Sequence, residues 1–179
     1  MAFKTFILDN IADRSRRHEM INEKAREYFG TPEAEVVYSS KGKPSVTGVT
    51  PEKYVSVTTT GAVMVVVFSD MPVGVDGEYL GRFSPGDHPE YTAIAERFFS
   101  EEEADYVRDN DGNPTAFARV WVRKEAYVKY TGRGLSEFPS FSVTDGERFF
   151  SKVNGVPIKR FAVNFPGSSD YIFAIAGNE

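Results

Sequence analysis

The sequence contains no cysteine and only two histidines among 179 residues. The absence of cysteine excludes disulfide bonds, thiolate metal sites and a cysteine nucleophile. So few histidines argue against a histidine-rich metal centre and against a Ser-His-Asp catalytic triad. Metal and nucleophile chemistry of these kinds is therefore set aside.

Long hydrophobic runs and an excess of positive charge are also missing. No apolar run approaches the roughly 20 residues that a membrane-spanning helix needs, and Asp9 and Asn10 stand where a signal peptide would continue apolar. The net charge of −5 argues against broad binding to nucleic acid or to anionic membranes, which favour an excess of lysine and arginine. We therefore expect a cytoplasmic, monomeric protein without a nucleic-acid or membrane partner.

What is present is the composition of an ordinary globular protein, with 41% hydrophobic and 26% charged residues. A chain of this length can bury its core as one domain or as two small lobes. β-rich runs predict strands at residues 4–9, 35–40, 54–60, 62–70 and 73–80. Helical patterns cover residues 14–29, 91–99 and 114–130, and a further helix follows Ser100, with Glu103 at the capping-box position.

Turn residues organise these segments into two similar halves. Gly61 and the pair Met71-Pro72 separate three β-rich runs, which predicts an antiparallel meander, and residues 81–90 have the composition of a loop. Asp145-Gly146 predicts a hairpin within residues 140–153, before closing strands. Helix plus strands thus occurs before and after roughly residue 80, which indicates an α+β fold of two lobes. We expect an N-terminal lobe of residues 1–80 and a C-terminal lobe of residues 81–179.

Two carboxylates stand close together on one predicted strand. Asp76 and Glu78 are two residues apart, so their side chains leave the same face of the strand. Taken alone, this pair is typical of an exposed strand face. The alternative is a pair of oxygen ligands for a hard cation such as Mg²⁺, which commonly uses one or two carboxylates together with substrate phosphate.

The segment WVRKEAYVKYTGRGL, residues 121–135, combines a helical apolar stripe with more charge than a core helix needs. Trp121 and Val128 can face a core, and Gly132 and Gly134 end the helix. Glu125 and Lys129 are spaced i, i+4, a pattern that most often means a surface ion pair contributing a few tenths of a kcal/mol. The same carboxylate could instead have a chemical role, and its own spacing leaves both interpretations open.

The two segments together resemble a signature of the 4'-phosphopantetheinyl transferase superfamily, in particular of its surfactin-synthetase-activating (Sfp) type. That signature is G-[IV]-D-x-E followed further along by W-x-x-K-E-[AS]-x-x-K, often continuing into G-x-G-L. Residues 95–103 (AERFFSEEE) and the upstream GKP of residues 42–44 are also similar to family segments. The signature positions present here are Gly74, Asp76, Glu78, Trp121, Lys124, Glu125, Ala126, Lys129, Gly132, Gly134 and Leu135.

The resemblance implies a fold, a reaction and a metal. The fold would be two pseudo-symmetric lobes, each a helix packed on a mostly antiparallel sheet, in one compact unit with the active site between them. The reaction would move the phosphopantetheine arm of coenzyme A onto a serine of an acyl or peptidyl carrier protein and release adenosine 3',5'-bisphosphate. Asp76, Glu78 and Glu125 would hold Mg²⁺ against the pyrophosphate. Glu125 would accept the serine proton, and Lys129 would contact phosphate oxygens.

The resemblance also implies contacts with coenzyme A and with the carrier. Lys43 and Lys124 would bind coenzyme A together with Lys129, and Arg17 and His18 would lie near its 3'-phosphate. The family usually has N-[IL]-S-H-[ST] where this chain has Thr58 and Thr59, which would take the coenzyme A positions of serine and histidine. Gly77 is smaller than the apolar residue usual between the two acids. The carrier would dock on the segment beginning at Gly132, with the basic residues Arg123 and Arg133 facing its acidic surface.

Two other functions remain open at this point. A non-catalytic relative could bind coenzyme A or a carrier protein without transfer, and the altered threonine segment favours it, whereas the three acids and Lys129 oppose it. A Mg²⁺-dependent phosphohydrolase would account for the carboxylates alone, but neither for GKP nor for the glycines after Lys129.

Overall fold

The computed structural model describes residues 3–9, 14–40, 42–82, 89–164 and 167–178. Residues 83–88 of the expected loop lie outside the described residues, and the segment before them forms a short 3-10 turn at Leu80–Arg82. The first half comprises β1 (Phe3–Asp9), α1 (Arg14–Phe29), β2 (Glu35–Tyr38), β3 (Pro44–Thr47), β4 (Tyr54–Thr60) and β5 (Val63–Ser69). The second half comprises β6 (Val73–Tyr79), α2 (Pro89–Phe98), α3 (Glu101–Asp109), α4 (Pro114–Thr131), a 3-10 helix (Leu135–Ser140), β7 (Lys152–Val153), β8 (Val156–Phe161) and β9 (Tyr171–Gly177).

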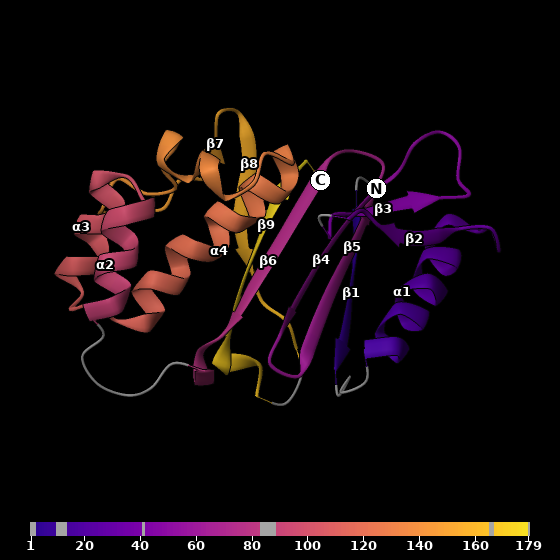
Figure 1. Ribbon diagram of the computed structural model, residues 1–179, viewed down its shortest axis with the longest axis horizontal. Coiled ribbons are helices and arrows are strands. Elements are labelled where there is room, and N and C mark those ends of the chain that lie inside the picture. Colours follow the sequence, from indigo (N-terminus) through magenta and orange to yellow (C-terminus); the bar gives the residue numbers. More distant parts are fainter. Residues whose placement is uncertain (1–2, 10–13, 41, 83–88, 165–166, 179) are drawn as a thin grey trace.

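The elements stack as layers, with α1 on one outer side and the other α-helices on the opposite side of two β-sheets (Figure 1). The first sheet has the strand order β1-β5-β4 and the second β6-β9-β8-β7, both antiparallel. Apolar clusters fill the spaces between α1 and the first sheet, between the sheets, and between the second sheet and α4. The expected α+β class, helices packed on antiparallel sheets, is confirmed. No helix in the described ranges is both long and apolar enough to cross a membrane.

The burial of β5 on both faces accounts for the continuous run of apolar residues from Val63 to Phe68. Every residue of this central strand is buried, because α1 covers one face of its sheet and the second sheet covers the other. Met64, Val66 and Phe68 pack toward α1, and Val65 and Val67 pack toward β6 and β9. A strand buried on both faces has no position at which a polar side chain would remain hydrated.

The expected meander of three strands is wrong at its third member. β4 and β5 pair as predicted, but β6 pairs with β9 and so belongs to the second sheet. β6 therefore lies in the second sheet although its residues precede residue 80, and the expected division into lobes at that residue stays a prediction. The expected hairpin around Asp145 is also reduced, since only a single bridge joins Thr144 to Phe149. Strand β3, which pairs with β2, lies in a segment that the sequence reading left unassigned.

Side-chain hydroxyls join β4 to β6 across the two sheets. Ser56 Oγ accepts a hydrogen bond from Val75 N (2.9 Å), and Thr60 Oγ1 accepts one from Tyr79 N (2.8 Å). Between them, Thr58 Oγ1 donates to a carboxylate oxygen of Asp76 (3.1 Å). Alternate residues of a strand face the same side, so the three hydroxyls form one row, which we call the hydroxyl ladder. The ladder holds β6 beside β4 without backbone pairing.

Candidate active site

Helix α4 lies directly on β6, and a glycine makes this approach possible. A Cβ atom added to Gly74 would stand 2.0 Å from the Ala126 carbonyl oxygen and 2.5 Å from Tyr130 N, so no other residue fits there without moving the helix. The helix itself is capped locally. Asn113 accepts from Thr115 N at the start, and Gly132 adopts a left-handed conformation (φ 73°) at the end. The motif glycine on β6 thus sets how close α4 comes to the strand's acidic residues.

The close approach brings the two signature segments into one open hollow of about 610 Å³. Asp76 and Glu78 contribute from β6, and Glu125 and Lys129 contribute from adjacent turns of α4. Trp121 lines the same hollow one turn before Glu125 while its ring packs against aromatic residues of the core. Residues 57–61 of β4 and the following turn form the opposite wall.

Two of the three carboxylates already have cationic partners. Lys129 Nζ donates to an Asp76 carboxylate oxygen (2.7 Å) and to the carbonyl oxygens of Val75 (3.1 Å) and Val57 (3.4 Å). Arg82 contacts both carboxylate oxygens of Glu78, at 3.0 and 3.1 Å. In the part of the chain that the structure describes, Glu125 has no hydrogen bond or ion pair, so the surface pair with Lys129 does not form.

Burial and mutual repulsion raise the pKa values of Glu78 and Glu125. Burial raises the pKa of Glu125, the charge of Asp76 adds to the rise and that of Lys129 opposes it, and together these effects place it at about 7. The pKa of Glu78 is also raised to about 7, mainly by burial; Asp76 and Glu125 contribute to the rise, whereas Arg82 and Lys129 oppose it. A carboxyl group with a pKa near neutrality can exchange a proton with a substrate at physiological pH.

The chemistry of these side chains suits a hard divalent cation, although their present arrangement is not a coordination shell. The described residues contain no group of three or more acidic or histidine side chains placed to hold a metal ion. The carboxylates of Asp76, Glu78 and Glu125 nevertheless share one hollow, and their unfavourable charge density is what an added cation would offset. Arg82 and Lys129 now supply that positive charge.

The unusual glycine between the two acids has a local explanation. A Cβ on Gly77 would stand 2.2 Å from the nearest ring carbon of Phe173, on the paired strand β9. The Phe173 ring therefore fills the space that a larger residue at position 77 would occupy. An aromatic side chain on the neighbouring strand replaces the apolar residue that the resemblance leads one to expect.

A second hollow of about 500 Å³ adjoins the first and shares Val57, Glu125 and Lys129 with it. Lys43 and the residues that follow α4, Gly132 and Arg133, line its far end. Lys43 approaches the helix end so closely that a Cβ on Gly132 would lie 2.8 Å from its Nζ. The exposed Arg133 side chain donates to Glu137 (3.0 Å).

A third hollow continues toward α1 and contains the remaining residues expected near the 3'-phosphate. Arg17, His18 and Thr59 line it, and it shares Val57 and Pro44 with the second hollow. His18 Nε2 lies 2.9 Å from the Val36 carbonyl oxygen. Thr58 lines the acidic hollow alone, whereas Thr59 lines both the acidic hollow and this one. The three hollows form a continuous strip from α1 to Glu125.

Lys124, expected to contact coenzyme A, lies elsewhere. Its side chain is fully buried, with Nζ 2.7 Å from a Glu103 carboxylate oxygen and 2.5 Å from the Phe141 carbonyl oxygen. Glu103 also accepts from Val143 N and completes the predicted capping box with Ser100. Lys124 thus ties α3 and α4 together and does not reach the hollows. The sequence interpretation failed here because the partners of this lysine are far from it along the chain.

Arg123, expected to meet the carrier, is also buried. Its guanidinium lies over the Phe149 ring (4.0 Å to the centroid), and Nη1 donates to the Arg119 carbonyl oxygen (2.9 Å). Its position on α4 directs it away from the hollow that contains Glu125. Conversely, Arg82 was missed by the sequence reading, because an arginine in a loop gives no signal that it will return to Glu78.

The chain is similar to known proteins over more than half of its length. The family model described as the 4'-phosphopantetheinyl transferase superfamily matches residues 72–176. "4'-phosphopantetheinyl transferase Sfp" of Bacillus subtilis (strain 168) is 31% identical over 105 residues, which cover 57% of this chain and 43% of the relative. "4'-phosphopantetheinyl transferase ffp" of Bacillus subtilis is 32% identical over 122 residues (65% and 51%), and "4'-phosphopantetheinyl transferase psf-1" of Bacillus pumilus is 32% identical over 114 residues (62% and 46%). The chain spans about half the length of the curated relatives it matches.

Proposed function

Because the chain belongs to the 4'-phosphopantetheinyl transferase superfamily, we propose that it transfers the 4'-phosphopantetheine arm of coenzyme A to a serine hydroxyl of an acyl or peptidyl carrier protein. One observation carries the proposal: Asp76, Glu78, Glu125 and Lys129, from two distant segments, line one open hollow. A protein that only bound coenzyme A would have no need to bury carboxylates at the cost of raising their pKa.

Glu125 is the proposed general base. Its carboxylate is open to the hollow, is not engaged by another described side chain, and has a pKa of about 7. In the proposed reaction, the serine oxygen bonds to the phosphorus that carries the pantetheine arm and its proton passes to Glu125. The phosphoanhydride bond breaks at the same phosphorus, and adenosine 3',5'-bisphosphate leaves with the bond electrons. Holding the two reactants in line contributes most of the remaining rate enhancement.

We propose that Lys129, together with a cation held by the acids of β6, offsets the negative charge of the pyrophosphate. Asp76, Glu78 and Glu125 would hold Mg²⁺, which when bound would act as a Lewis acid toward phosphate oxygens. Lys129, now paired with Asp76, has a partly exposed ammonium group that can turn to a phosphate oxygen. Thr58 positions Asp76 through its hydroxyl. The chain's own groups thus supply both positive charge and oxygen ligands.

The strip of three hollows is the proposed binding site for coenzyme A. Arg17, His18 and Thr59 at the α1 end would receive the 3'-phosphorylated nucleotide, and Lys43 would contact the phosphates along the way. Arginine and lysine side chains are the usual partners of phosphate groups. The pyrophosphate would then reach the acidic hollow that contains Glu125.

The carrier is proposed to dock on the segment that begins at Gly132. Arg133 is exposed beside the second hollow, whereas the buried Arg123 has no part in docking. We predict that Arg133→Glu slows modification of an acidic carrier more than it weakens coenzyme A binding, because a rim charge mainly affects the encounter of two proteins. Transfer kinetics and coenzyme A titrations of the same variant measure the two effects. Equal losses in both would remove the docking role.

The direct test is transfer itself. The protein is incubated with coenzyme A, Mg²⁺ and an apo carrier protein, and the intact mass of the carrier is recorded; the proposal requires the mass gain of the arm. Omission of Mg²⁺ is the matched control for the metal. Coenzyme A binding without transfer to any of several carriers would identify a non-catalytic relative and overturn the proposed function.

A further inference from the structure

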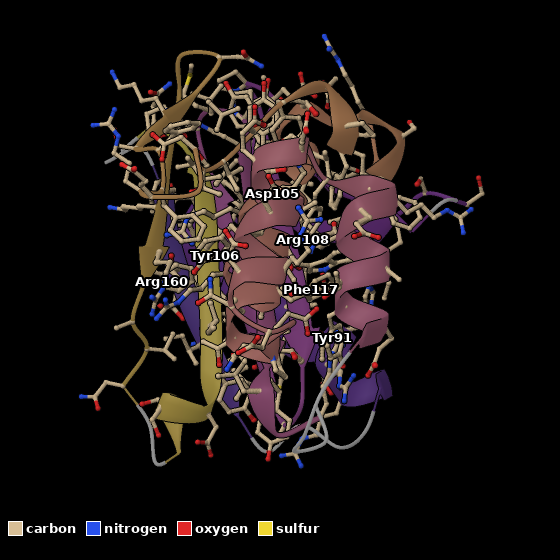
Figure 2. The ribbon with its side chains drawn as sticks, turned by 90° about the vertical axis from the view of Figure 1, so that its left-hand side faces the viewer. Tyr91, Asp105, Tyr106, Arg108, Phe117 and Arg160 are labelled. Atoms are coloured by element: carbon tan, nitrogen blue, oxygen red, sulfur yellow. The ribbon has the colours of Figure 1, made fainter. Side chains whose placement is uncertain are left out.

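Three arginines converge on the side of α4 that faces away from the active site. Arg119 and Arg123 follow each other at one-turn spacing on the helix, and Arg160 extends from β8 toward them. Tyr106 of α3 and Phe149 border the same region. Figure 2 shows Tyr106 and Arg160 beside each other, next to α4. We call these three residues the arginine cluster.

The cluster is built around a fixed and buried guanidinium. Arg123 has only 7% of its surface exposed, stacks on Phe149, and donates to the Arg119 carbonyl oxygen. The other two arginines are more open, because Arg119 is half-buried and Arg160 is exposed. The cluster therefore combines a buried guanidinium with one at the surface.

Negative charge is missing from this region. Among the described residues, no carboxylate forms an ion pair with any of the three arginines, whereas Lys124, Lys129 and Arg133 each have one. Arg119 Nε and Arg123 Nε are the buried side-chain donors without a hydrogen-bond partner in the described chain. Burial and the charges of Arg160 and Arg119 lower the pKa of Arg123 to about 10. Buried donors and like charges without a partner are costly, and a bound anion would relieve both costs.

We propose that the arginine cluster binds a small oxyanion, such as phosphate or a carboxylate, at a site between α4 and β8 that is separate from the transfer site. Guanidinium groups present N–H donors in a planar fork that suits phosphate and carboxylate oxygens. The exposed fork of Arg160 and the half-buried guanidinium of Arg119 would provide the first donors, and the buried Nε atoms of Arg119 and Arg123 would be reached as these side chains turn toward the anion. The anion would also strengthen the packing of α4, the helix that carries Glu125 on its other side.

Thermal unfolding of the whole chain, without coenzyme A or divalent metal, tests the site with inorganic phosphate and acetate as probes. Ionic strength is held constant with sodium chloride. We expect phosphate to raise the melting temperature of the parent saturably, and Arg160→Gln to weaken the apparent affinity about tenfold, the loss of roughly one charge-assisted hydrogen bond. Without an added oxyanion, Arg160→Gln should melt above the parent because one repulsive charge is gone. The same titration with acetate shows whether the site binds a carboxylate more tightly than it binds phosphate.

Matched variants separate this site from other effects of phosphate. Arg148→Gln changes an exposed arginine that is paired with Asp145 outside the cluster, and it should keep the parent's response. Lys129→Gln removes a cation of the transfer hollow and should also keep it. Arg123→Gln should abolish the response, and Arg160→Gln is the decisive variant if that protein does not fold. Equal phosphate shifts in the parent and Arg160→Gln, no shift in either, or a shift lost only in Lys129→Gln would each overturn the proposal.

Discussion

At the scale of single residues, Glu125 allows chemistry to be separated from structure. Its carboxylate is surrounded by unfavourable charge and makes no hydrogen bond to the described residues, so Glu125→Gln should leave the fold intact. We expect turnover in carrier modification to fall by about two to four orders of magnitude, because the amide can neither accept the serine proton nor contribute charge to a metal site. Transfer kinetics and thermal melts of the same preparation measure the two effects. An unchanged rate would refute the role of base.

The raised pKa values of Glu78 and Glu125 make the stability of the metal-free protein depend on pH. Both groups have folded-state pKa values of about 7, above the ordinary value of 4.5. Between these values the folded state binds more protons than the unfolded state, so their stabilising contribution is complete below about 4.5 and is lost as the pH rises through 7.

Denaturant titrations with a chelator, between pH 5 and 8, test this linkage. The free energy of unfolding of the parent should fall relative to that of Glu125→Gln as the pH rises, since the amide does not titrate. A constant difference across this range would contradict the assigned pKa of Glu125. The opposite sign would mean that its carboxylate is paired with a cation in solution.

At the scale of elements, the contact between α4 and β6 is set by one missing side chain. Gly74→Ala places a methyl group against the Ala126 carbonyl oxygen, so α4 must move outward and carry Glu125 and Lys129 with it. We expect a stability loss of about 1–3 kcal/mol and a loss of transfer rate that persists at temperatures where the variant is fully folded. Gly155→Ala, where an added Cβ meets no atom within 4 Å but the φ of +82° is unfavourable for alanine, is the control: it should lose stability for a backbone reason alone and keep the transfer rate.

Local patterns predicted the elements better than their partners. The bounds of α1 and β4 follow from the helix-stopping Gly30 and from the run of β-branched residues, both of which act over a few positions. The pairing of β6 with β9 joins segments from opposite ends of the second half, and hydrophobic alternation carries no information about such a partner. The same limit misplaced Lys124, because an exposed phosphate ligand and a buried partner of Glu103 look alike in the sequence.

At the scale of the whole molecule, the hydroxyl ladder connects the two sheets and so helps to hold the hollow between them. Thr60→Val keeps the side-chain shape but leaves Tyr79 N without its acceptor, and Ser56→Ala does the same to Val75 N. Each change should cost about 1–3 kcal/mol of stability. Thr59→Val, on the exposed face of the same strand, is the control for stability. Guanidinium titrations compare the three variants, and equal effects from all three would show that the ladder contributes nothing specific.

The hydroxyl ladder affects how the hollow between the sheets can change during evolution. Each sheet keeps its own backbone pairing, and among the described residues the hydroxyl groups of Ser56, Thr58 and Thr60 supply the direct hydrogen bonds between β4 and β6. Every threonine codon and most serine codons are one nucleotide from an alanine codon, so single mutations can weaken this junction. Selection can therefore adjust the width of the hollow in small steps while both sheets keep their strand pairing.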